Sequence, residues 1–255
     1  MSELARTPSF RLDGKRALVT GAGRGIGAAM AAALAEAGAE VTLVARSSKQ
    51  IEALAAAIRN EGGAATALAM DACDTAGVEA FFAACEPLDI LINNAGTNRP
   101  MPMQDVSEDD FDAVMELNLK AAFFVAQGWA KQLIQHAKPG SMIHIGSQMG
   151  HVGGPNRSLY CASKWALEGM NKAFALDLAK HNIRSNTICP TFIETPLTKP
   201  FFEDEAFKAS VLEKIKLGRI GQVEDLMGAA VFLASDASAL MTGSSLVIDG
   251  GWTAD

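Results

Sequence analysis

The chain predicts a doubly wound α/β fold, in which helices cover both faces of a parallel sheet of seven strands. Short, continuous apolar runs alternate with longer helical segments along nearly its whole length. The 255 residues contain no linker rich in Pro, Gly or Ser and no internal repeat. We therefore expect a single domain over residues 1–255.

The expected elements follow one another in a regular order. We expect strands at 15–20, 40–45, 66–70, 87–92, 141–145, 184–188 and 245–248, and helices at 25–38, 48–60, 75–85, 107–135 and 160–181. Apolar side chains recur on one face of the helix at 48–60. Ser107, followed by Asp110 three residues later, is typical of a helix N-terminus.

Residues 191–218 interrupt this order. The segment contains two prolines and several aromatic residues, namely Pro196, Pro200, Phe192, Phe201, Phe202 and Phe207. A long insertion that carries aromatic side chains after a strand favours a substrate lid over a binding site. A pair of surface helices over a small apolar cluster is the alternative.

Composition argues against several classes of function. The net charge is −7 and no basic run exceeds two residues, so we expect no nucleic-acid surface. No apolar run approaches the roughly 18 residues of a membrane span. The N-terminus Met1-Ser2-Glu3-Leu4 lacks the features of a signal peptide. The cysteines and histidines show no metal-ligand spacing, so we expect no metal site, free thiols and a cytoplasmic location.

A glycine-rich loop follows the first strand and opens the first helix. Its glycines Gly21, Gly25 and Gly27, with Ile26 between the last two, differ from the G-x-G-x-x-G spacing. Glycine permits a tight turn and lets a diphosphate approach the free N–H groups of the helix N-terminus. An ordinary glycine turn is the alternative.

The end of the second strand bears on the choice of cofactor. NAD sites usually carry Asp or Glu there, to bind the ribose 2′-hydroxyl, whereas this strand runs into Ala45-Arg46-Ser47. Arg46, together with Arg24 of the glycine loop, suits a 2′-phosphate. The sequence thus favours NADP over NAD, unless both arginines are solvated surface residues.

The only tyrosine, Tyr160, precedes Lys164 by one helical turn, and Ser147 lies thirteen residues upstream. A nearby ammonium favours phenolate, so we expect Lys164 to lower the pKa of Tyr160 from about 10 towards neutrality. Such a phenol donates and accepts protons at neutral pH. A structural tyrosine beside a surface lysine is the alternative.

Together these motifs resemble those of the short-chain dehydrogenase/reductase superfamily, and the resemblance extends from about Leu12 to Trp252. It implies a Rossmann-type fold and an NAD(P)-dependent oxidoreductase, usually a homotetramer built on paired long helices and on the C-terminal segment. The implied catalytic residues are Asn118, Ser147, Tyr160 and Lys164. The implied cofactor-binding residues are Gly21, Arg24, Gly25, Ile26, Gly27, Arg46, Ser47, Asp71, Ala72, Asn93, Ala95, Gly96, Tyr160, Lys164, Pro190, Ile193 and Thr195.

The resemblance also implies roles. Asp71 and Ala72 approach adenine, Asn93 steadies the sheet, and Ile193 and Thr195 adjoin the nicotinamide. Ser147 polarises the carbonyl, Lys164 also binds the nicotinamide ribose, and Asn118 holds a water of a proton relay. One departure stands out, because Thr191 follows Pro190 where the superfamily commonly has glycine. It puts the backbone path near the nicotinamide in doubt.

The substrate is less well defined by the sequence. Ser147, Tyr160 and the polar residues Gln148, His151 and Asn156 favour a sugar, polyol or small polar ketone, unless the polar side chains satisfy only loop backbone. Leu159, Asn98, Arg99, Phe192, Phe201 and Phe202 are further pocket candidates. A 3-oxoacyl-carrier-protein reductase is the alternative activity. A catalytically silent NADP sensor is disfavoured, because Tyr160 and Lys164 are both present.

Overall fold

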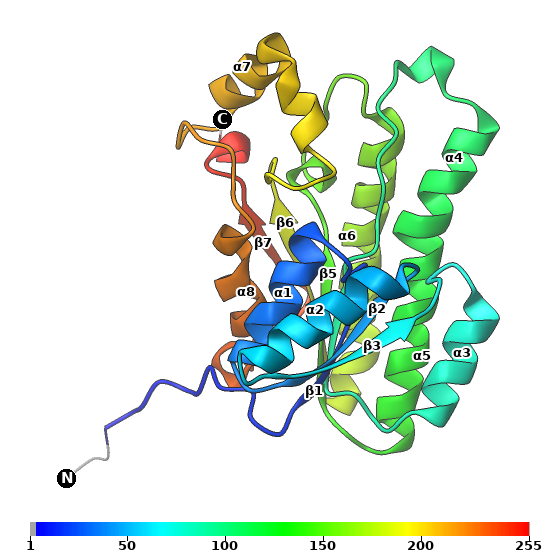
Figure 1. The fold of residues 1–255 in the computed structure, drawn as a ribbon, viewed down its shortest axis with the longest axis vertical. Coiled ribbons are helices and arrows are strands. Elements are labelled where there is room, and N and C mark those ends of the chain that lie inside the picture. The colour runs from blue at the N-terminus through cyan, green and yellow to red at the C-terminus, as the bar shows by residue number, and fades with distance from the viewer. Residues whose placement is uncertain (1–3, 255) are drawn as a thin grey trace.

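The computed structural model describes residues 4–254. Its centre is one sheet of seven strands, all parallel, in the order β3-β2-β1-β4-β5-β6-β7 (Figure 1). The strands are β1 (Arg16–Thr20), β2 (Glu40–Ala45), β3 (Ala64–Ala69), β4 (Ile90–Asn93), β5 (Gly140–Ile145), β6 (Ile183–Pro190) and β7 (Ser245–Ile248). The predicted fold class is confirmed. The strand order reverses between β1 and β4, where folds of this class bind ligands.

Helices cover both faces of the sheet, as predicted (Figure 1). One layer holds α1 (Gly25–Glu36), α2 (Ser48–Asn60) and α8 (Glu224–Ala234). The other holds α3 (Thr75–Ala84), α4 (Glu108–Met115), α5 (Ala122–Gln135) and α6 (Ser158–Leu178). The last helix, α7 (Glu205–Lys214), lies beyond the carboxyl ends of the strands.

Two apolar cores lie between the sheet and these layers. Successive side chains of a strand point to opposite faces, so Val19 joins the core under α1 while its neighbour Leu18 joins the core under α5. In the same way Ile143 packs on the first side and Met142 on the second. Strands buried on both faces explain the continuous apolar runs in the sequence.

The helix predicted over 107–135 is divided in three. α4 begins with the expected capping box, in which the Asp110 backbone N–H donates to Ser107 Oγ at 3.1 Å. A π-helix over Glu116–Ala121 then separates α4 from α5. The predicted helical structure is therefore present from Glu108 to Gln135, and the π-helical turns inside it were not predicted.

The segment 191–218 is partly helical. It contains a 3-10 helix (Lys199–Glu203) and α7. Phe192 packs against Phe207 and Trp252, with ring centroids 5.7 and 5.8 Å away. The aromatic side chains of the segment thus form a cluster of their own above the sheet.

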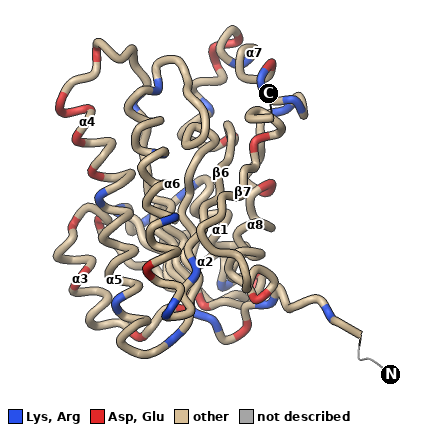
Figure 2. Tube along the Cα trace, turned by 180° about the vertical axis from the view of Figure 1, so that it is seen from behind, with Lys and Arg blue, Asp and Glu red and all other residues tan. Residues whose placement is uncertain are grey.

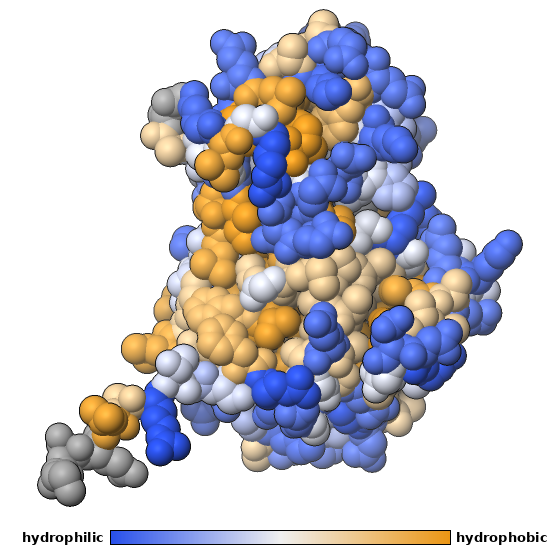
Figure 3. Space-filling view, turned by 60° about the vertical axis from the view of Figure 1, so that its left-hand side comes forward, coloured by the Kyte–Doolittle hydropathy of each residue, from blue (hydrophilic) through white to orange (hydrophobic). Residues whose placement is uncertain are grey.

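The surface mixes charge and apolar area. Figure 2 shows basic and acidic residues interspersed over the helices on its side of the molecule. Figure 3 shows apolar surface on the face that carries α7, α8 and the C-terminal segment, where Leu217 and Val247 are exposed. No helix within residues 4–254 has the length and apolar character to cross a bilayer. The signal-peptide prediction rests partly on residues 1–3, which lie outside the described residues.

Candidate active site

A cavity of about 590 Å³ opens along the carboxyl edge of the sheet. Its walls come from the loops that follow six strands, β1 to β6, and from the first turns of α1 and α6. The fold therefore gathers residues that lie far apart in the chain at the point where the strand order reverses.

The glycine loop forms part of the wall of this cavity. Gly21 and Gly25 have φ of +63° and +57°, a conformation that favours glycine. A Cβ on Gly27 would lie 2.5 Å from the Gly21 carbonyl oxygen. α1 begins without a side-chain cap, so its first N–H groups are left for a ligand. This geometry fits the diphosphate of a dinucleotide.

Asn94 holds that loop in place, a role that the sequence analysis missed. Its Nδ2 donates to the carbonyl oxygens of Thr20 and Gly21 at 3.0 and 3.2 Å. Asn93, one residue earlier, points away from the cavity, and its Nδ2 donates to the Ala122 carbonyl at 2.6 Å. Asn93 thus links β4 to α5, whereas the contact with the cavity comes from Asn94, Ala95 and Gly96. The Asn-Asn-Ala-Gly motif was the available signal.

The end of the cavity beside β2 and β3, where an adenosine would bind, is basic. We call it the adenosine end. Arg24, Arg46 and Ser47 line it, and both arginines are exposed. Within residues 4–254 neither guanidinium forms an ion pair with a carboxylate. Asp71, just after β3, and Ala72 line the same end. This set of donors fits an adenosine that carries a 2′-phosphate.

Ser147, Tyr160 and Lys164 meet at the other end of the cavity. Ser147 follows β5, while Tyr160 and Lys164 lie one turn apart near the start of α6. The Lys164 ammonium donates to the Ile145 carbonyl at 2.7 Å and lies 5.6 Å from the centroid of the Tyr160 ring. Burial lowers the pKa of Lys164 to about 8.

The structure corrects the predicted effect of Lys164 on Tyr160. Burial raises the pKa of the Tyr160 phenol, and the Ser147 hydroxyl and the charge of Arg157 only partly offset that rise. The i, i+4 spacing was interpreted as a close charge pair, whereas the ammonium is directed to a backbone carbonyl. In this structure the phenol is therefore held in its protonated form.

Asn118 lies in the π-helix and is buried behind the cavity. Its Oδ1 accepts from the Thr97 backbone N–H at 2.7 Å, and its Nδ2 donates to the Thr97 carbonyl and to Ser163 Oγ at 2.9 and 3.1 Å. The side chain thus connects the loop after β4 to α6. Its predicted role in holding a relay water stays a prediction.

Thr191 is the first residue of the loop after β6. Pro190 pairs with Ile248, and the Thr191 N–H donates to the Ile248 carbonyl at 3.2 Å. Thr191 does not have the positive φ that would favour glycine. Pro190, Ile193 and Thr195 all line the cavity. Thr191 is therefore accommodated without a positive φ, and the residues on both sides of it line the cavity.

Of the predicted polar substrate residues, Gln148 lines the cavity, and its Oε1 accepts from Ser147 Oγ at 2.8 Å. His151 and Asn156 do not line it, which corrects their assignment. The Asn156 carbonyl instead accepts from the Met101 N–H at 3.1 Å. Of the other candidates, Asn98, Phe192 and Phe201 line the cavity, whereas Leu159, Arg99 and Phe202 do not.

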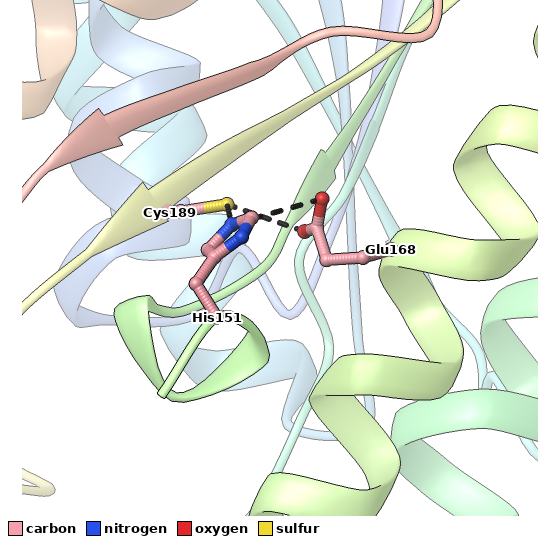
Figure 4. A group of neighbouring side chains, drawn as sticks. All are labelled: His151, Glu168 and Cys189. Atoms are coloured by element: carbon pink, nitrogen blue, oxygen red, sulfur yellow. Dashed lines mark hydrogen bonds and ion pairs between the residues drawn. The ribbon is translucent and has the colours of Figure 1, made fainter. Parts of the chain in front are cut away.

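His151 turns instead towards Glu168 of α6 and Cys189 of β6, with which it forms a cluster (Figure 4). Its Nε2 lies 3.4 Å from Cys189 Sγ and 3.9 Å from Glu168 Oε2. Glu168 also accepts hydrogen bonds from the hydroxyls of Thr187 and Ser245 at 2.9 and 2.6 Å. Burial and this carboxylate raise the pKa of the Cys189 thiol to about 12. Sequence spacing gave no signal for this cluster, because α6, β6 and β7 meet only in the fold.

Comparison with known proteins decides the family. Residues 21–253 match the family model described as enoyl-(acyl carrier protein) reductase. The chain belongs to the short-chain dehydrogenase/reductase superfamily. It is therefore an NAD(P)-dependent oxidoreductase, and Tyr160, Lys164 and Ser147 occupy the end of the cavity where that chemistry is expected.

Similar proteins of known name cover nearly the whole chain. Gluconate 5-dehydrogenase of Gluconobacter oxydans is 39% identical and aligns over 96% of both chains. D-threitol dehydrogenase of Mycolicibacterium smegmatis is 39% identical over 98% of this chain and 97% of the relative. The crystal structure of a gluconate 5-dehydrogenase from Burkholderia cenocepacia J2315, in complex with NADP and tartrate, is 40% identical. It matches with a TM-score of 0.92 over 96% of this chain and 98% of that one.

Proposed function

We propose that the protein transfers a hydride between NADP(H) and a secondary alcohol or ketone of a sugar, polyol or small polar ketone. The observation that carries the proposal is the junction of Ser147, Tyr160 and Lys164 with the polar side chain of Gln148 in one cavity. An apolar substrate would leave this polar wall unpaired. Relatives named for gluconate and threitol support the same class of substrate.

NADP is the proposed cofactor. Arg24 and Arg46 would bind its 2′-phosphate, the glycine loop its diphosphate, and Ile193 and Thr195 would adjoin its nicotinamide. A similar solved structure that contains NADP supports this preference. When bound, the cofactor supplies or accepts the hydride.

The chain's own residues position the substrate and move its proton. The Ser147 hydroxyl holds and polarises the substrate oxygen, and Tyr160 donates its proton to that oxygen in the reduction direction. Because burial raises the pKa of Tyr160, the phenol carries this proton at neutral pH. Lys164, with a pKa of about 8, is mostly charged at neutral pH and stabilises the phenolate as it forms. In the oxidation direction Tyr160 accepts the proton.

We also propose the assembly and location that the sequence predicts. Exposed aromatic side chains on α4, α5 and α6 support a homotetramer, because a neighbour would cover them: Phe111, Phe123, Phe124 and Trp165. Four free cysteines support a cytoplasmic location. Residues 191–218 are proposed as the substrate lid, since Phe192 and Phe201 line the cavity.

A substrate panel tests the proposal. Sugar and polyol substrates, small polar ketones and a 3-oxoacyl thioester are assayed with NADPH or NADP⁺, and in parallel with NADH or NAD⁺. We expect the highest kcat/KM for a substrate of the sugar, polyol or small polar ketone class with the phosphorylated cofactor. A preference for the 3-oxoacyl thioester would favour the alternative, a 3-oxoacyl-carrier-protein reductase, for which a solved structure 31% identical to this chain is named. Higher efficiency with NADH would overturn the cofactor assignment.

A further inference from the structure

Arg157 is a buried cation in the wall of the cavity. It immediately precedes α6, three residues before Tyr160, and is only 8% exposed. Its Cζ lies 5.8 Å from the centroid of the Phe201 ring, and its Nη1 donates to the Asn156 carbonyl at 3.4 Å. Within residues 4–254 no carboxylate forms an ion pair with it. Burial without a counter-charge is costly for a guanidinium.

The position of Arg157 indicates which molecule supplies the missing anion. Its charge acts on the phenol of Tyr160, so it lies at the reacting end of the cavity. The phosphate groups of a dinucleotide are accounted for by Arg24, Arg46 and the glycine loop, which follow β1 and β2. An anion beside Tyr160 therefore belongs to the substrate.

We propose that Arg157 binds the carboxylate of an acyclic sugar acid, so that the preferred substrates are aldonates and keto-aldonates. This inference rests on the proposed function and narrows its substrate class. The planar guanidinium matches a carboxylate through two parallel hydrogen bonds. Arg157 lines the cavity, with its Cζ over the Phe201 ring. Gln148 lies in the same wall, where the hydroxyls of such a chain would pass.

Two competing substrate classes fit Arg157 less well. A neutral polyol has a hydroxymethyl group where an aldonate has its carboxylate, and it would leave the guanidinium buried and unpaired. A substrate carried on an acyl carrier protein places its phosphate far from the reacting carbon, with an uncharged acyl chain beside Tyr160. A site built for one polar partner discriminates strongly against an analogue that lacks it.

Matched pairs of substrates test this inference. Oxidation by NADP⁺ is followed for D-gluconate against D-glucitol, D-mannonate against D-mannitol, and D-galactonate against galactitol. The members of each pair differ in the terminal carboxylate that replaces a hydroxymethyl group. We expect the wild-type kcat/KM for the best aldonate to exceed that of its alditol by roughly a hundredfold.

Variants then assign the preference to Arg157. Arg157→Met keeps the apolar stem and removes the charge, so the aldonate-to-alditol ratio should fall to near one. Arg157→Lys keeps the charge without the fork and should give an intermediate ratio. Removing the charge of Arg157 also changes the pKa of Tyr160. This change acts on both members of a substrate pair and cancels in the ratio of their kcat/KM values. Arg59→Met, on the exposed end of α2 and outside the cavity, should keep the wild-type ratio.

The outcomes separate the inference from the function on which it rests. Equal or better oxidation of alditols by the wild type overturns the role of Arg157 and leaves the proposed function standing. An aldonate-to-alditol ratio in Arg157→Met equal to that of the wild type also overturns the role of Arg157 and leaves the proposed function standing. Inactivity of the wild type towards every aldonate, alditol and keto sugar, with turnover of another carbonyl class, contradicts the proposed function itself. An unfavourable wild-type ratio is enough to overturn the inference, so the test can fail even if a variant does not fold.

Discussion

His144 is buried inside β5, and neither of its ring nitrogens has a hydrogen-bond partner among the described residues. Burial lowers its pKa to about 3, from 6.5 in the unfolded chain. Between these two values the unfolded chain binds a proton that the folded chain does not. The free energy of unfolding should therefore decrease as the pH falls from 6.5 towards 3, by up to about 5 kcal/mol.

A single substitution tests this linkage. His144→Leu removes the titrating ring, so its free energy of unfolding should fall between pH 7 and pH 5 by about 2 kcal/mol less than that of the wild type. Urea unfolding at the two pH values measures the difference. His136→Gln, at the exposed C-terminal end of α5, is the matched control for the loss of a histidine. Parallel pH dependence in wild type and His144→Leu would contradict the assignment.

Arg46 carries the prediction of cofactor choice. Its exposed guanidinium lines the adenosine end of the cavity, so Arg46→Ala should raise the KM for NADPH by about tenfold or more and leave that for NADH nearly unchanged. Initial-rate kinetics with both cofactors measure the two constants, with Arg59→Ala as the control. A wild-type enzyme that binds NADH more tightly than NADPH would show that the end of β2 was misinterpreted.

At the scale of the element, hydrophobic pattern predicted most of the sheet and its helices. The strands at 40–45 and 245–248 and the helix at 48–60 have the predicted bounds. Each combines a local apolar pattern with a clear end signal. α8 was not assigned, because it is apolar around most of its circumference and its N-cap residue, Val223, provides no side-chain cap. The π-helix that carries Asn118 was not predicted.

The proposed lid gives the next prediction. Residues 191–218 contain short helices and a local aromatic cluster, with few residues in the two cores of the sheet. Their amide hydrogens should exchange rapidly in the free enzyme and more slowly with NADP(H) bound. Hydrogen exchange monitored by mass spectrometry measures both states. Equal protection with and without cofactor would favour a rigid pair of surface helices instead.

Assembly is predicted at the scale of the whole molecule. Trp165 is 54% exposed on α6 and Phe123 and Phe124 are partly exposed on α5, so a free monomer would present large aromatic side chains to water. Light scattering at micromolar concentration should give the mass of a tetramer. Trp165→Glu should shift the distribution to smaller species, while the exposed Leu176→Glu serves to show whether any charge on α6 has that effect. A monomeric wild type would contradict the proposal.

Only part of the site could be predicted from the sequence. Its motifs follow strands in order, so the glycine loop, Arg46, Ser147 and Tyr160 could be placed at one edge of the sheet before the fold was known. The direction in which a loop side chain points could not be predicted in this way. His151 turns to a buried carboxylate and Arg157 enters the cavity, and both outcomes depend on the packing of α6 against β6.

The central claim is that Tyr160 moves the proton in a cavity whose other residues bind the cofactor. Tyr160→Phe keeps the ring and removes the hydroxyl, and the most direct measurement compares its kcat with its affinity for NADPH, determined by fluorescence titration. We expect kcat to fall by about a hundredfold or more while the Kd for NADPH stays close to that of the wild type. Near-normal turnover by the phenylalanine variant would contradict the account.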